Sequence, residues 1–147
     1  RDLVDYEGFA RRCGPGQRMH FPGRLDDADV DALFDRADVF VFPTLADTLP
    51  LVVLEAMSHG TPVVASAVGG IPFELEGGCG ELVPPGDAPA LRGAVEALMA
   101  DPRRRAEMAT AARARVEESF QWPAAALSAL TAYDLTLRGA GAAVQPR

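Results

Sequence analysis

Two carboxylates stand eight residues apart in a stretch of the chain that carries no other charge. Asp47 lies among loop-forming residues, and Glu55 is the only charge in the apolar segment 50–57. We expect this segment to be a helix that begins at Pro50, where proline loses no hydrogen bond, and ends before Gly60. A helix N-terminus offers free N–H groups and a positive dipole end, which suit a phosphate. Glu55 could then accept hydrogen bonds from a ribose diol, and Asp47 could reach hydroxyls on the other side of the phosphate.

The same two residues allow a simpler interpretation. Asp47 could be a turn former, and Glu55 could be a solvated helix residue that binds nothing. An acidic side chain within an otherwise apolar helix is harder to dismiss, because burying it without a partner is costly. From these residues alone the two interpretations carry equal weight.

The elements around these residues alternate between strand and helix. Continuous apolar runs at 38–42 and 62–66 predict strands covered on both faces, as in a parallel sheet. Shorter strands are predicted at 18–21 and 80–83. Helical patterns are predicted over about 27–36, 50–59, 71–75, 91–99, 103–119 and from 122 onward. This succession predicts a Rossmann-like, doubly wound α/β fold with C-terminal helices over 1–138, followed by a loose Gly/Ala-rich tail over 139–147.

Ligands of open α/β sheets bind in the loops that follow the carboxyl ends of the strands. Three such loops are expected here, at 22–25, 43–50 and 67–70. The first has a glycine beside an arginine, Gly23 and Arg24. The second leads into a helix N-terminus, and is therefore the most informative of the three.

Composition excludes several classes of function. All 14 basic residues are arginine, so a Schiff-base lysine or a P-loop lysine is excluded. The net charge of −7 leaves nucleic acid no broad basic surface to bind. No apolar run approaches the roughly 20 residues of a transmembrane helix. Cys13 and Cys79 are too few for a disulfide framework, and we interpret them as reduced thiols of a cytosolic protein.

An acidic run at 26–31 contains the Asp-x-Asp pattern that some transferases use to hold a metal. This run opens a predicted helix, where the dipole favours acidic side chains. His20 and His59 also lack a second ligand at metal-binding spacing. We therefore favour the helix-start interpretation and expect no metal site.

Together these residues resemble the group 1 (GT4) family of retaining glycosyltransferases, which have the GT-B fold. The resemblance rests first on Asp47, the seven residues after it, Glu55, and the run that continues to Ser66. Further segments occur in the family's order at 21–25, 39–44, 68–72, 80–87, 101–108 and 120–133. The likeness covers about 18–133, and it is specific as a set although each motif alone is weak.

The resemblance implies that the chain binds a nucleotide-sugar donor of the UDP or GDP type and needs no other cofactor. Glu55 would bind the ribose, and Asp47 would be the catalytic acid beside the transferred sugar. The N–H groups of Thr48, Leu49 and Leu51 would face the diphosphate. The remaining donor-binding positions implied are Gly23, Arg24, Leu25, Gly69 and Gly70.

The chain also departs from the family pattern. Position 47 is Asp rather than Glu, and Pro50 stands where relatives often have glycine. The family's upstream arginine and lysine pair and its N-terminal acceptor-binding domain are missing. We therefore expect this chain to be the C-terminal half of a cytoplasmic transferase and to be inactive by itself. In one version of the hypothesis, the full-length transferase is peripheral to a membrane. Two alternatives stay open: a degenerate, non-catalytic GT-B module that supports folding or binds a partner, and a GT-B-like nucleotide-sugar epimerase.

Overall fold

A parallel three-stranded sheet forms the centre of the molecule. The computed structural model describes residue 8 and residues 19–143. Its strands lie side by side in the order β1 (Phe40–Phe42), β2 (Val63–Ser66) and β3 (Gly80–Val83). All pairings are parallel, with Val41 opposite Val64 and Val64 opposite Glu81. Neighbouring parallel strands linked by helices confirm the predicted α/β class.

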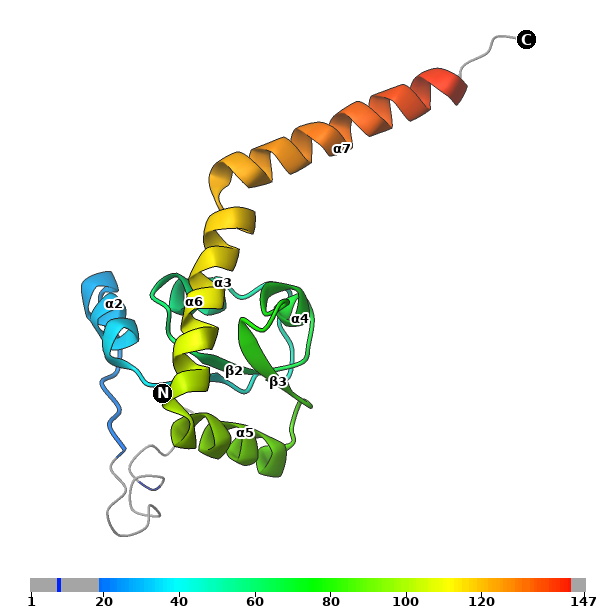
Figure 1. Cartoon of the computed structure of the whole chain (residues 1–147). Coiled ribbons are helices and arrows are strands. Elements are labelled where there is room, and N and C mark those ends of the chain that lie inside the picture. The colour runs from blue at the N-terminus through cyan, green and yellow to red at the C-terminus, as the bar shows by residue number, and fades with distance from the viewer. Residues whose placement is uncertain (1–7, 9–18, 144–147) are drawn as a thin grey trace.

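Helices cover both faces of this sheet (Figure 1). The helices of the described region are α2 (Asp27–Arg36), α3 (Leu51–Ser58), α4 (Ile71–Glu74), α5 (Ala88–Ala100), α6 (Pro102–Ser119) and α7 (Trp122–Ala143). Three of them begin with an aspartate whose carboxylate accepts a hydrogen bond from the N–H three residues on. These N-caps are Asp26, Asp87 and Asp101. Asp26 therefore serves the start of α2, as the acidic run predicted.

The core is divided by β2, whose four residues are all buried. Val63 and Ala65 pack with side chains of α2, α3, α4 and α6 on one face. Val64 packs with Val83, Leu98 and Met108 on the other face, which α5 and α6 cover. A strand enclosed in this way must be apolar on both sides, which explains its continuous hydrophobic run.

Several predicted boundaries differ from the structure. Residues 19–21 form no strand and are exposed, because no partner strand for them occurs among the residues described, and Arg18 lies outside those residues. The first strand is limited to Phe40–Phe42. Pro50 is the residue before α3 rather than its first residue, with an extended ψ of 109°. In α5, Met99 is about half exposed, whereas Leu98 is buried.

The last helix leaves the body of the molecule, and its far end lies away from the sheet (Figure 1). Its large hydrophobic side chains are not covered: Leu127, Leu130 and Tyr133 are each 65–70% exposed. The helix continues to Ala143, past the predicted start of the tail, because alanines, which favour helix, lie between and after the two glycines of this segment. Residues 144–147 lie outside the described part. No helix in that part is long and apolar enough to cross a membrane.

Cys79 has a free, buried thiol that donates to the backbone oxygens of Glu76 and Ala111. This contact ties the segment before β3 to α6. Cys13 lies outside the described residues.

Candidate functional site

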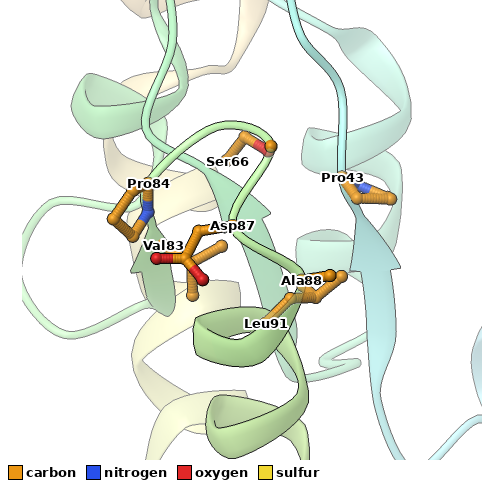
Figure 2. A pocket seen from close by; sticks show the side chains of 8 residues that line it. Pro43, Ser66, Val83, Pro84, Asp87, Ala88 and Leu91 are labelled. Atoms are coloured by element: carbon orange, nitrogen blue, oxygen red, sulfur yellow. The ribbon is translucent and has the colours of Figure 1, made fainter.

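Three loops meet at the carboxyl ends of the strands. They follow β1, β2 and β3 and span 43–50, 67–70 and 84–87. A pocket of about 120 Å³ lies between the first and third of them. Figure 2 shows its walls, with Pro43 on one side, Val83, Pro84 and Asp87 on the other, and Ser66 above. The end of the sheet that binds ligands in open α/β folds is therefore hollow here as well.

Gly69 and Gly70 allow two of these loops to touch through their backbones. Gly69 has a φ of +53°, and a Cβ atom on it would lie 1.8 Å from the carbonyl oxygen of Asp47. A Cβ on Gly70 would lie 2.5 Å from the carbonyl oxygen of Thr48. The N–H of Gly70 donates to that same oxygen at 2.6 Å. These two glycines thus fix the backbone of the Asp47 loop, a positioning role that requires the absence of a side chain.

The N-terminus of α3 opens toward solvent. Thr48, Leu49 and Leu51 are exposed, while Pro50 is buried. No acceptor for the N–H groups of Thr48, Leu49 or Leu51 is found among the residues the structure describes. Asp47 is half-buried beside them. The predicted phosphate-binding site therefore consists of unused backbone N–H donors at the positive end of a helix.

Glu55 is exposed on the outer side of α3. The cost of burying an unpaired acid therefore does not apply to it, and within 19–143 it forms no ion pair. Its carboxylate is open to a ligand or to water. The structure is thus compatible with both sequence interpretations of this residue.

The loop that contains the implied donor-binding residues Gly23, Arg24 and Leu25 lies before α2. Gly23 has a φ of +73° with open space around it, and Arg24 is exposed. Leu25 is half-buried and lines a separate hollow of about 330 Å³ next to α2. None of these three residues lines the pocket of Figure 2. The structure therefore leaves this loop apart from the pocket between the strand ends.

An acid that the sequence interpretation overlooked lies beneath the site. Glu74, the last residue of α4, is fully buried, and neither carboxylate oxygen has a hydrogen-bond partner. Burial, and secondarily the negative charge of Asp47, raise the pKa of Glu74 to about 7. The cost of burying an acid, which the sequence suggested for Glu55, applies instead to Glu74. The sequence contained the same signal for Glu74, because this residue stands between apolar residues in the segment 71–75.

A second overlooked group joins α2 to the far end of α3. His59 Nδ1 lies 2.7 Å from Asp35 Oδ1, and His59 Nε2 lies 3.3 Å from Asp31 Oδ1. The hydrogen bond to Asp35 is the largest cause that raises the pKa of His59. Arg113 of α6 donates to the carbonyl oxygen of His59. The spacing of four residues between the aspartates could have indicated one helix face, but not the histidine that meets it.

Comparison with known proteins identifies the family. Residues 4–115 match the family described as "Glycosyl transferases group 1". The chain belongs to the group 1 glycosyltransferases. This confirms the resemblance drawn from the segment that runs from Asp47 to Ser66.

Individual group 1 relatives are similar over most of this chain. Glycogen synthase of Mycobacterium tuberculosis is 36% identical over 131 residues, which cover 88% of this chain and 32% of that protein. Sucrose-phosphate synthase from Thermosynechococcus elongatus superposes with a TM-score of 0.76 and 36% identity, over 90% of this chain and 34% of that one. HepE of Anabaena, solved in complex with UDP-glucose, superposes with a TM-score of 0.60 and 27% identity. This match covers 74% of this chain and 30% of HepE. The chain thus spans about a third of the length of these proteins.

Proposed function

We propose that this chain forms the donor-binding half of a retaining glycosyltransferase that transfers a sugar from a nucleoside diphosphate to an acceptor. The observation that carries the proposal is the solvent-facing N-terminus of α3 at the carboxyl end of the sheet, with unused N–H donors. Such a helix end suits the diphosphate of a UDP- or GDP-type donor. The UDP-glucose complex of HepE, a structural relative, supports a donor of this class.

The exposed residues around this helix end supply the remaining roles. Glu55 accepts hydrogen bonds from the ribose hydroxyls, and Asp47 faces the transferred sugar as the catalytic acid. The loop with Gly23 and Arg24 faces the base. An arginine there, rather than an acid, avoids repulsion from the diphosphate.

Charge on the departing diphosphate is the main electrostatic demand of the transfer. Fixed N–H donors and the helix dipole stabilise that charge without reorganisation. The chain has no lysine, and Pro50 contributes no N–H to the site. Further cations and the acceptor site therefore come from the rest of a longer protein, and this chain alone binds the donor weakly without turnover.

Donor binding is tested by a chemical-shift titration of the chain with UDP-glucose, GDP-mannose and ADP-glucose at millimolar concentrations. We expect saturable shifts in the amides of 47–55, with one nucleotide clearly preferred. Glu55→Gln should weaken binding, while Glu96→Gln on exposed α5 should leave it unchanged. Absence of saturable shifts with every donor would contradict donor binding by this chain.

A non-catalytic module is the second candidate. It is favoured by Pro50, which removes one phosphate donor at the start of α3, and by the shorter acid at position 47. The two candidates separate in a longer protein that contains this chain. Sugar transfer with retained anomeric configuration, measured by proton NMR of the product, supports the enzyme. Nucleotide binding that is accompanied by neither sugar transfer nor hydrolysis of the donor supports the non-catalytic module.

A further inference from the structure

Glu74 is a buried acid with no structural partner. Its exposed fraction is 0%, and neither carboxylate oxygen meets a hydrogen-bond donor. Its neighbours Ile71 and Leu75 belong to the apolar core. Few buried polar groups in native proteins lack a partner, because each costs free energy. The presence of an acid at this position is therefore not explained by packing alone.

Backbone contacts connect this acid to the Asp47 loop. The N–H of Glu74 donates to the carbonyl oxygen of Gly70 at 3.0 Å, and the N–H of Gly70 donates to that of Thr48 at 2.6 Å. Gly69 touches the backbone of Asp47 so closely that a Cβ would overlap it. The short helix α4 and the loop 47–49 thus form one continuous backbone unit. A change in charge at Glu74 acts directly beneath the residues proposed to face the donor.

Among the charged groups around Glu74, Asp47 is the one whose charge affects its ionisation. Arg115 of α6 donates to the carbonyl oxygen of Phe73 and to the carboxylate of Glu76, on the exposed side of α4. The single charged residue of α3, Glu55, is exposed. The negative charge of Asp47 disfavours the ionised form of Glu74. A diphosphate at the N-terminus of α3 would disfavour it further, because both act through a poorly solvated interior.

We propose that Glu74 is a positioning residue of the donor site, which takes up a proton when a nucleotide-sugar binds. The inference rests on the proposed function. The carboxylate of Glu74 accepts one proton from the solvent and becomes a neutral acid, and no bond of the donor is made or broken. The neutral form removes a second negative charge from beneath Asp47 and the diphosphate, and it provides an O–H donor under the loop.

The pKa of Glu74, about 7, makes this uptake measurable at neutral pH. The experiment follows the carbon-13 signal of the Glu74 carboxyl in the 147-residue chain, assigned by its loss in Glu74→Gln. In the free chain the midpoint should lie near 7, and Asp47→Asn should lower it by about half a unit or more. Saturation with UDP-glucose should raise it. This probe is chosen because each of its phosphates carries one ester and one anhydride bond, so that it has no phosphate group titrating near pH 7.

Calorimetry in buffers of different ionisation enthalpy then counts the protons. At pH 7.5 binding of UDP-glucose should take up about half a proton, and Glu74→Gln should abolish the uptake while the chain still binds. His59→Asn is the matched control, because His59 is a second group with a raised pKa, and its loss should leave the uptake intact.

Two results would overturn the proposal: a Glu74 midpoint in the ordinary glutamate range, or a proton uptake that persists in Glu74→Gln. A residue needed only for packing would change stability without changing the proton count. If UDP-glucose fails to bind at all, the proposed function is contradicted, and the free-chain titration with Asp47→Asn still decides whether Glu74 is neutral beneath the loop.

Discussion

Helices α3 and α4 both follow a strand of the same sheet, and each carries one acid among apolar residues, yet the two acids have opposite surroundings. Glu55 of α3 is exposed, whereas Glu74 of α4 is fully buried. Helix α3 has two turns and presents a full outer face to solvent, while α4 is a single turn directly above the core. The comparison shows that two acids in similar sequence surroundings at the end of one sheet differ completely in their contact with solvent.

The largest effect is expected where α4 is fixed to the Asp47 loop. Gly69→Ala places a Cβ atom 1.8 Å from the carbonyl oxygen of Asp47, at a φ of +53°. We expect a loss of about 3 kcal/mol or more in the free energy of unfolding, measured by urea denaturation. Gly93→Ala is the control, because nothing lies within 4 Å of its added Cβ in α5. The control should stabilise the chain by up to about 1 kcal/mol, and equal effects of both variants would contradict the tight loop contact.

The second effect separates the two acids by pH. The folded pKa of Glu74 is raised from 4.5 to about 7, so the folded state holds a proton that the unfolded state has lost in this interval. Stability should therefore fall as the pH rises from about 4.5 to 7 and then level off. Glu74→Gln should be close to neutral at pH 4 and more stable than the parent chain by about 3 kcal/mol at pH 8.

Denaturation curves at both pH values check this, and Glu55→Gln supplies the matched exposed acid. Because Glu55 is exposed, Glu55→Gln should leave the free energy of unfolding close to that of the parent chain. A pH-independent effect of Glu74→Gln would mean that the buried acid stays neutral throughout or gains a partner.

The third effect concerns direct contact with the donor. Under the proposed function, Glu55→Gln removes a charged acceptor for the ribose hydroxyls, and a hydrogen bond to such a charged group is worth roughly 1.5–3 kcal/mol. We expect nucleotide-sugar affinity to fall about tenfold or more, measured by chemical-shift titration, with stability unchanged. Unchanged affinity would assign Glu55 to the solvated face of α3 and leave the donor hydroxyls to other residues.

The smallest effect lies at the opposite end of α3, where His59 meets Asp31 and Asp35. The pKa of His59 is raised in the folded state, so its stabilisation is complete below the unfolded value of 6.5 and is lost as the pH rises through the folded value. His59→Asn should therefore lower the melting temperature at pH 6, by the equivalent of about 1 kcal/mol, and have little effect at pH 9. Asp35→Asn should give the same pH profile, and a profile of opposite sign would exclude the ion pair.

Much of the fold could be predicted because its elements have local signals. The continuous apolar run at 62–66 predicted β2 enclosed between two layers, and the helical pattern at 91–99 predicted the body of α5. The strand predicted at 18–21 failed for the opposite reason. A strand needs a partner, and apolar residues alone do not supply one.

The site was predictable in part. The spacing of Asp47 and Glu55 and the glycine pair at 69–70 carried the family resemblance, which the match over 4–115 confirms. The burial of Glu74 and the contact between His59 and α2 could not be predicted, since both depend on which residues from distant segments face each other. Asp35 and His59 are 24 positions apart in the chain.

The sequence by itself determined the family and the alternation of strands and helices, because periodicity and capping residues are local properties. Only the tertiary structure decided the charge environment of each acid. Whether a carboxylate is solvated or buried depends on what its helix packs against. The surrounding core is assembled from strands and helices that are distant in the sequence. For this reason Glu55 is open to water, while Glu74 lies in the core with its pKa raised toward neutrality.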